Sequence, residues 1–276
     1  MTPRLPTRGE AARRGTELAR IIGERGYRAP SGRWIDLSVE LARSIAGTVS
    51  YRPDTPRFER PPSASRQLEA STANEASLEA AYRLHREGRR PAVLNFASAK
   101  NPGGGFRSGA RAQEESLCQA STLFACLEGQ PMYEHHRALH HPLYTRWTIH
   151  SPEVPVVRGA DGALLESPWP CTFLTSPAPN TKVLLERAPL RSPEVSSALT
   201  AGVRQILAVA ANHGHDTLVL GAWGCGVFGN DPATVARLFR DALLGEFVGV
   251  FSRVHFAVLD WSEEQCFLGP FARTFG

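Results

Sequence analysis

The segment that most constrains the fold of this 276-residue chain lies between residues 91 and 127. An apolar run at residues 91–97 is typical of a buried strand, three consecutive glycines follow at residues 103–105, and residues 113–127 carry the apolar stripe of a helix. A strand, a glycine loop and a helix start, in this order, place backbone N–H groups where they can hold an anion such as phosphate. The segment therefore predicts an α/β protein with a ligand loop at the end of a strand.

The start of this helix carries two neighbouring acids, Glu114 and Glu115, directly after Gln113. Acids in a first helical turn complement the helix dipole, but they also repel phosphate. The simplest reason for their presence is chemistry on a sugar attached to the phosphate. Neighbouring residues lie about 100° apart on a helix, so the two acids are not expected to form the opposed pair that flanks the scissile bond in ordinary glycosidases. One acid is expected to do the chemistry while the other orients the substrate.

A second glycine loop, residues 221–230, follows the apolar run at residues 217–220. Asp231 and Pro232 then open a helix, with Asp at a cap position and Pro in the first turn. Further strands are expected at residues 147–149, 154–157, 171–175 and 254–259, and further helices at residues 9–25, 35–45, 71–87 and 192–213. This alternation predicts a central sheet with helices on both faces, and because ligands bind beyond the carboxyl ends of strands, both loops are expected to border one cleft.

The second loop superficially matches the GxGxxG pattern of dinucleotide-binding proteins. Such a fold needs an acid about 20 residues further on, at the end of the next strand. Asp241 has nearly this spacing but lies in the middle of a predicted helix, and neither loop is followed by the Gly-Lys-Ser/Thr of a P-loop. A dinucleotide-dependent oxidoreductase is therefore disfavoured.

Composition limits the remaining classes of protein. No run of about 18 apolar residues exists, so no membrane span is expected. Five widely spaced cysteines without a CxxC pair predict reduced thiols and a cytoplasmic protein. Residues 1–66 contain 13 arginines and 7 acidic residues, which could attract a polyanion, but Arg dominates the whole chain and Lys100 and Lys182 are its only lysines. A solvated, Arg-rich extension is the simpler interpretation.

Several further side chains are of types that bind ligands or react. The histidines at positions 135, 136, 140 and 141 include an i,i+4 pair without a carboxylate between them, so neither a metal nor a cofactor is predicted. Cys225 could be a nucleophile with His255 as its base, but a small residue that fills the loop is the favoured interpretation. Aromatic residues near the C-terminus that could stack an adenine are Trp261, Phe267 and Phe271, although core packing is the favoured interpretation for each of them.

Three motifs in the same order carry a resemblance to a known family. Residues 95–106 with the Gln-Glu-Glu run at 113–115, residues 174–180, and residues 221–232 resemble the bacterial-type poly(ADP-ribose) glycohydrolases, whose signature is a GGG motif followed by a QEE motif; here seven residues separate the two. The resemblance implies a macrodomain-like three-layer α/β/α sandwich with a mixed central sheet. It further implies that residues 1–70 are an N-terminal helical extension packed on the main domain and that residues 71–276 are the macrodomain-like catalytic domain.

The resemblance also implies roles for individual residues. Glu115 would be the catalytic acid and Glu114 a partner that orients the substrate. The first loop would belong to the catalytic site, and the second would bind the diphosphate, with Phe228 positioning the terminal ribose. The implied substrate-binding residues are Asn101, Gly103, Gly104, Gly105, Gln113, Gly224, Cys225, Gly226, Val227, Phe228 and Gly229.

The implied activity is hydrolysis of the ribose–ribose O-glycosidic bonds of poly(ADP-ribose), from chain ends, to release ADP-ribose in the context of the DNA damage response. The implied partners are poly(ADP-ribose), ADP-ribose and ADP-ribosylated proteins, with no membrane and no direct DNA contact. Two alternatives stay open: a non-catalytic ADP-ribose-binding macrodomain, and a hydrolase of single ADP-ribose groups on proteins. A binding module would need the glycine loops but not Glu114 and Glu115.

Overall fold

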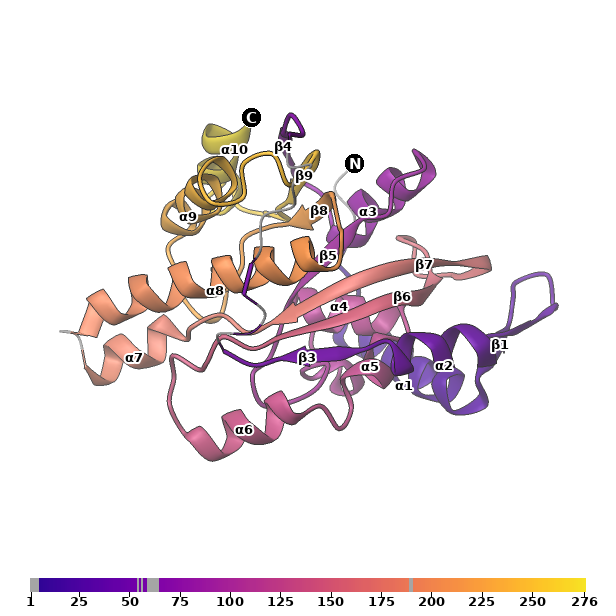
Figure 1. Ribbon diagram of the computed structural model, residues 1–276. Coiled ribbons are helices and arrows are strands. Elements are labelled where there is room, and N and C mark those ends of the chain that lie inside the picture. The colour runs from indigo at the N-terminus through magenta and orange to yellow at the C-terminus, as the bar shows by residue number, and fades with distance from the viewer. Residues whose placement is uncertain (1–4, 54, 56, 59–64, 189–190) are drawn as a thin grey trace.

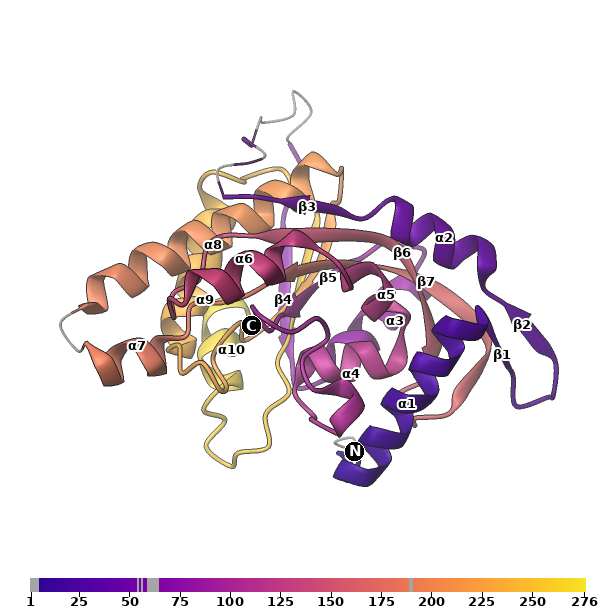
Figure 2. The same ribbon diagram turned by 90° about the horizontal axis from the view of Figure 1, so that it is seen from below.

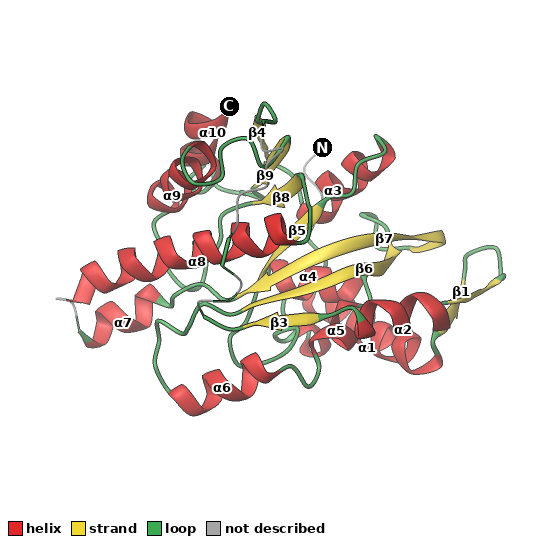
Figure 3. Ribbon diagram, viewed as in Figure 1, coloured by secondary structure: helices red, strands yellow, loops and turns green. Residues whose placement is uncertain are grey.

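The structure, a computed structural model, describes residues 5–53, 55, 57–58, 65–188 and 191–276. A mixed seven-stranded sheet in the order β3-β6-β7-β5-β8-β9-β4 runs through its centre (Figure 3). Five strands from β7 to β4 pair in parallel, and β6 and β3 add antiparallel pairs at one edge. The strands are β3 Val49–Tyr51, β4 Glu69–Ala73, β5 Ala92–Phe96, β6 Thr148–Arg158, β7 Leu164–Ser176, β8 Thr217–Leu220 and β9 Arg253–Ala257.

Helices cover both faces of the sheet and complete the predicted three-layer α/β/α sandwich (Figure 1). One face is covered by α7 Thr181–Arg187, α8 Ser192–Asn212, α9 Pro232–Leu244 and α10 Leu268–Phe275. The other is covered by α1 Arg8–Glu24, α3 Ser77–Arg86, α4 Gln113–Ala120, α5 Leu123–Leu127 and α6 Pro131–Leu139. A short 3-10 helix, η1 Phe106–Ser108, follows the first glycine loop.

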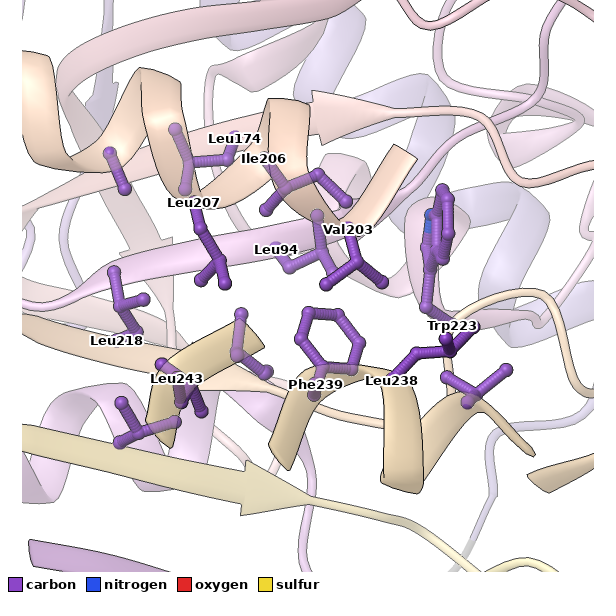
Figure 4. Close-up of a cluster of buried hydrophobic side chains, with 14 of the residues drawn as sticks. Leu94, Leu174, Val203, Ile206, Leu207, Leu218, Trp223, Leu238, Phe239 and Leu243 are labelled. Carbon is purple, nitrogen blue, oxygen red and sulfur yellow. The ribbon is translucent and has the colours of Figure 1, made fainter. Parts of the chain in front are cut away.

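Two hydrophobic cores lie on the two sides of the sheet, because successive side chains of a strand point to opposite faces. Leu94 and Leu218 belong to the core under α8 and α9, which Figure 4 shows, whereas Val93 and Val219 belong to the opposite core. All four are at most 1% exposed. Burial on both faces explains why β5 and β8 are continuous apolar runs in the sequence, and each such side chain contributes about 1.5–3 kcal/mol to stability.

The N-terminal segment adds α1, a hairpin of β1 Gly26–Arg28 and β2 Trp34–Asp36, α2 Ser38–Ala46 and the edge strand β3. Helix α1 begins with a capping box in which Thr7 and Glu10 satisfy each other's backbone N–H groups. The helix lies beside α4 (Figure 2). The domain boundary at residue 70 stays a prediction: β3 already pairs with β6 of the main sheet, and residues 59–64, just before the boundary, lie outside the described residues.

Several predicted elements differ from the structure, each for a local reason. The helix expected at residues 71–87 starts only at Ser77, because residues 69–73 form β4, which pairs with β9. The helix expected at 113–127 is broken after Ala120, where Ser121 turns extended and bridges to Val156. The helix expected at residues 35–45 begins at residue 38, after β2.

Two further differences concern the length of one strand and the number of helices. The strands expected at residues 147–149 and 154–157 are one strand, β6, with an irregularity between Ser151 and Val154. Helices α6, α7 and α10 were not predicted from the sequence. Within the described residues, no helix is long and apolar enough to cross a membrane.

Candidate active site

The two glycine loops leave the sheet from neighbouring strands. β5 and β8 are paired in parallel, with Val93 opposite Val219, so the loops that follow them emerge at the same edge of the sheet (Figure 1). The end of β7, also parallel to β5, joins the two: the Ser176 carbonyl accepts hydrogen bonds from Ala97 N at 3.3 Å and from Trp223 Nε1 at 2.9 Å. The structure therefore brings the two loops to one side of the molecule.

The first loop is shaped by the carboxylate beneath it. Gly103 and Gly104 have φ angles of 67° and 56°, in the left-handed region that favours glycine. A Cβ added to Gly104 would lie 2.2 Å from Glu115 Oε1 and 3.2 Å from Glu114 Oε2. The two acids, although about 100° apart around their helix, therefore converge on the same glycine. Asn101, at the start of the loop, is exposed, and its carbonyl accepts a hydrogen bond from Gly104 N at 3.0 Å.

Glu115 is held by the loop through its backbone. Its Oε1 accepts a hydrogen bond from Gly105 N at 2.9 Å, and the residue is 9% exposed. It sits in the first turn of α4, where the helix dipole favours a negative charge. The carboxyl group of Glu115 therefore lies against the first glycine loop, at the edge of the sheet where the second glycine loop also emerges.

Glu114 is buried more deeply, at 3% exposure. Its Oε2 accepts a hydrogen bond from Ser98 N at 2.6 Å, and Asn95 Nδ2 donates to Oε1 over 3.4 Å. Burial raises the pKa of Glu114 to about 8, the charge of Glu115 adds to this, and the hydrogen bonds oppose it. Glu114 makes no salt bridge within the part of the chain that the structure describes.

Gln113, the first residue of the QEE motif, points back into the sheet. Its Oε1 accepts from Phe96 N at 2.9 Å, and its Nε2 donates to the Leu94 carbonyl at 2.7 Å and to Ser77 Oγ at 3.1 Å. All of its hydrogen-bonding groups are thereby engaged within the protein. The structure indicates that Gln113 fixes the start of α4 against the end of β5.

The second loop has a buried anchor and an open tip. Gly224 has a φ of 73°, and a Cβ there would lie 2.3 Å from Asn230 Nδ2. Asn230, 2% exposed, donates to the carbonyls of Pro179 and Gly224, both at 3.0 Å. Gly226, by contrast, has nothing within 4 Å of an added Cβ.

Three other residues of this loop differ in exposure. Val227 is 81% exposed, whereas Phe228 is half-buried and its ring lies 6.0 Å from that of Tyr144. The loop ends at Gly229, with a φ of 69° and its added Cβ 3.2 Å from Lys182 Cβ. Lys182 is exposed and donates its backbone N–H to the Phe228 carbonyl at 3.0 Å. One of the two lysines of the chain therefore borders the second loop.

The structure does not bring the alternative nucleophile and base together. Cys225 is 5% exposed, its Sγ lies 3.7 Å from the Trp223 carbonyl, and burial raises the pKa of its thiol to about 12. His255 is engaged with Ser71 of the neighbouring strand, Nδ1 to Oγ at 2.8 Å. A protonated thiol is a poor nucleophile, so Cys225 fills the loop.

The histidine cluster is structural where it is buried. His136 Nε2 accepts a hydrogen bond from Thr145 N at 3.0 Å, and Nδ1 lies 3.3 Å from the Ala99 carbonyl. Burial lowers the pKa of His136 to about 4, so the ring is neutral and ties α6 to the chain before the first loop. No cluster of three or more metal-ligating side chains occurs among the described residues.

The candidates for adenine stacking separate in the structure. Phe271 is 0% exposed and belongs to the core, which agrees with the favoured interpretation and leaves it unavailable to a ligand. Trp261 is 47% exposed and Phe267 is half-buried. Both lie on the segment that follows β9, which Asp260 shapes by accepting hydrogen bonds from Phe267 N and Leu268 N at 2.7 and 2.9 Å.

Sequence reasoning missed the residues that support the loops. Asn95 interrupts an otherwise apolar strand, and this polar residue at a buried position was the available signal. Asn230, at the end of the second loop, and Ser98, before the first, gave no signal that separates them from ordinary loop residues. Gly15 of α1 was also missed; a Cβ there would lie 2.2 Å from the Phe106 carbonyl oxygen.

Comparisons with known proteins agree on one family. The model of the microbial-type PARG catalytic domain matches residues 15–159. The chain is similar to the solved poly(ADP-ribose) glycohydrolase of Thermomonospora curvata, with and without the inhibitor ADP-HPD, at 42% identity over 97% of this chain and 100% of that one, with TM-scores of 0.89 and 0.91. It is also similar to the Deinococcus radiodurans enzyme in complex with ADP-ribose, at 42% identity over 85% of this chain and 96% of that one, with a TM-score of 0.78. No curated protein matches the chain.

Proposed function

Because the chain belongs to the microbial-type poly(ADP-ribose) glycohydrolases and is a glycoside hydrolase that acts on poly(ADP-ribose), we propose that Glu115 is the group that cleaves the ribose–ribose bond. The observation that carries this assignment is the contact of its carboxylate with the first glycine loop, Oε1 to Gly105 N at 2.9 Å. Glu114 and Glu115 meet at Gly104, so the sugar is expected over this point, with Glu114 orienting it. Hydrolysis distinguishes the protein from a macrodomain that only binds ADP-ribose.

We assign the diphosphate to the second loop on electrostatic grounds. The first loop has two carboxyl groups against it, whereas the second has the exposed Lys182 beside Gly229 and the N-terminus of α9 directly after it. A helix N-terminus and a lysine both favour an anion. The open backbone at Gly226 leaves room for the phosphate oxygens to reach N–H groups. We assign Phe228, half-buried near the end of this loop, to the terminal ribose.

The proposed reaction has two steps. Glu115 donates a proton to the oxygen of the leaving ribose as the glycosidic C–O bond breaks, and the remaining ribose becomes an oxocarbenium-like cation that the nearby diphosphate stabilises. The carboxylate then takes a proton from a water molecule, whose oxygen bonds to the anomeric carbon. The acid is thereby regenerated, and one water is consumed for each bond broken. A single group that acts first as acid and then as base has precedent in glycoside cleavage.

Glu114 need not repel the substrate in this scheme. Because burial raises its pKa to about 8, its neutral form prevails at neutral pH. A neutral carboxyl group can orient a ribose hydroxyl through hydrogen bonds without adding a second negative charge beside the diphosphate.

We further propose that the enzyme removes ADP-ribose from chain ends, acts on ADP-ribosylated proteins in the DNA damage response, and works in the cytoplasm. All five cysteines are free thiols, four of them buried, which supports a reducing compartment. Product analysis decides the first point, since cleavage from chain ends gives ADP-ribose from the earliest time points, whereas internal cleavage gives oligomers first.

The test of Glu115 is digestion of poly(ADP-ribose) by wild type and by Glu115→Gln, with free ADP-ribose as the readout. Loss of a general acid–base typically costs about 10²–10⁴-fold in rate, and ADP-ribose binding should persist. Ser116→Ala, at the exposed next position of the same helix, is the control and should keep wild-type turnover. A Glu115→Gln variant that retains most of the wild-type turnover would remove Glu115 from the catalytic role.

A further inference from the structure

The N-terminal helix α1 touches the catalytic loop with backbone against backbone. Gly15 is buried, and a Cβ added there would lie 2.2 Å from the Phe106 carbonyl oxygen, 2.9 Å from Phe106 C and 3.1 Å from Arg107 Cα. All three atoms belong to the backbone of η1, so no flexible side chain can move aside to make room. Only glycine permits this approach.

A second close contact lies two helical turns away. Gly109 has a φ of 81°, and a Cβ there would lie 2.3 Å from the Arg8 carbonyl oxygen. Arg8 Nε also donates to the Ser108 carbonyl over 3.4 Å, and Arg111 donates to the Pro6 carbonyl at 3.1 Å. The start of α1 and its middle therefore both hold the segment that follows the glycine loop.

This segment is coupled directly to the catalytic carboxylate. η1 begins at Phe106, one residue after Gly105, whose N–H donates to Glu115 Oε1. The Phe106 ring packs under the loop, with its Cδ1 3.0 Å from an added Cβ on Gly103. A shift of the Phe106 backbone would therefore move Gly103, which packs on its ring, and Gly105, whose N–H binds the Glu115 carboxylate.

Helix α1 also reaches the far end of α4. Glu17 pairs with Arg158 at 2.6 Å, and Arg158, 6% exposed, donates from Nε to the Gln119 carbonyl at 3.0 Å. Gln119 in turn donates to the carbonyls of Phe106 and Ala110, at 3.4 and 3.1 Å. Contacts with α1 therefore help to fix both the first glycine loop and α4, the helix that carries Glu115.

We propose that α1 is a clamp that positions the catalytic loop over Glu115, with Gly15 as the positioning residue that sets the distance between them. This inference builds on the proposed role of Glu115 at the same site. Helix α1 then contributes to the rate of the chemical step through its contact with the catalytic loop. A displacement of about 1 Å in a catalytic group can cost about 10²-fold in rate.

The test compares two Gly→Ala substitutions in one helix. Gly15→Ala meets the Phe106 backbone, whereas Gly23→Ala, near the exposed end of α1, has nothing within 4 Å of its new Cβ. Both replace glycine in a helix and gain the same helix propensity. We expect Gly15→Ala to lower kcat for poly(ADP-ribose) by about 10-fold to 10²-fold with KM and ADP-ribose affinity close to wild type, and Gly23→Ala to keep wild-type kcat.

Equal kcat values for the two variants would overturn the clamp. If Gly15→Ala fails to fold, the double variant Arg8→Ala/Arg111→Ala decides, because it removes both side-chain hydrogen bonds between the start of α1 and the segment after the loop. A lower kcat at unchanged KM supports the proposal, and wild-type kcat overturns it. Because Glu115 is intact in all of these variants, the clamp can fail while Glu115→Gln remains inactive. A failure of the clamp is therefore distinguishable from a failure of the catalytic assignment.

Discussion

The two glycine loops have similar compositions, but their surroundings differ in kind. In the first, Gly104 is crowded by the carboxyl groups of Glu115 and Glu114, and the turn is closed by a hydrogen bond from Gly105 N to Glu115. In the second, Gly224 at the base is crowded by the neutral Asn230 amide and by Ala178 Cβ, with no carboxyl group against it, and the tip at Gly226 has no atom within 4 Å of an added Cβ. A loop that serves chemistry is fixed against its reacting group, whereas a loop that binds a diphosphate keeps its N–H groups accessible.

The largest expected effect comes from the same substitution made in both loops. Gly104→Ala places a Cβ 2.2 Å from Glu115 Oε1 at a φ of 56°. The resulting shift of the carboxylate should lower kcat by about 10²-fold or more. Gly226→Ala meets no atom within 4 Å, so it should change KM at most. Steady-state digestion of poly(ADP-ribose) measures both, and similar kcat values for the two variants would break the comparison.

The anchor of the second loop can be removed by Asn230→Ala. This leaves the Pro179 carbonyl without the Asn230 donor at a buried site and removes one of two donors to the Gly224 carbonyl, which keeps the backbone N–H of residue 230. Loss of a buried hydrogen bond of this kind typically costs about 1–3 kcal/mol of stability. ADP-ribose affinity should fall as well, because the loop loses its fixed base. Urea denaturation and calorimetric titration provide the two readouts.

Asn101→Ala is the matched control in the first loop. Asn101 is exposed, so its removal should change stability by no more than about 0.5 kcal/mol. If Asn101→Ala destabilises the protein as much as Asn230→Ala does, the second loop has no special anchor.

The pH dependence of stability reports on the carboxyl group buried below the first loop. The pKa of Glu114 is raised from its ordinary value of 4.5 to about 8 in the folded protein. Between these values the unfolded chain is ionised while the folded site keeps its proton, so the contribution of Glu114 to stability decreases as pH rises through this window and levels off above about 8. Relative to Glu114→Gln, wild type should therefore lose stability from pH 4.5 to about 8. Parallel stability curves would show that Glu114 is already ionised in the folded state.

The smallest expected effect concerns the two lysines. Lys182 borders the second loop at Gly229, and Lys100 precedes the first. An exposed charge contact is typically worth about 0.2–1 kcal/mol, so Lys182→Ala should weaken ADP-ribose binding by about five-fold or less and reduce its salt dependence. Lys100→Ala should change the affinity less. The opposite order would place the diphosphate nearer the first loop.

Much of the fold and the order of the site motifs could be predicted from the sequence. The apolar runs of β5 and β8 and the glycines behind them indicate parallel strands whose loops meet at one edge, and the structure has this arrangement. Strand β4 was mistaken for part of a helix, because residues 69–73 are held in the sheet by pairing with β9 rather than by their own propensity. Such long-range pairing leaves no local pattern.

The support of the site was the part that the sequence could not show. The contact of Gly15 with Phe106 joins residues that are far apart in the chain, and a glycine inside a helix otherwise has no distinctive pattern. The side-chain direction of Gln113 was equally hidden: next to two acids it looks like a ligand, yet it bonds the backbone of β5. The roles of Glu114 and Glu115 stay predictions that the geometry supports.

The most direct test of the division between the two loops is a crystal structure of Glu115→Gln with ADP-ribose bound. The account predicts that the diphosphate oxygens accept hydrogen bonds from backbone N–H groups of residues 224–229 and that the terminal ribose lies against residue 115 and Gly104. A diphosphate bound at residues 103–105, or a ribose directed away from residue 115, would contradict it.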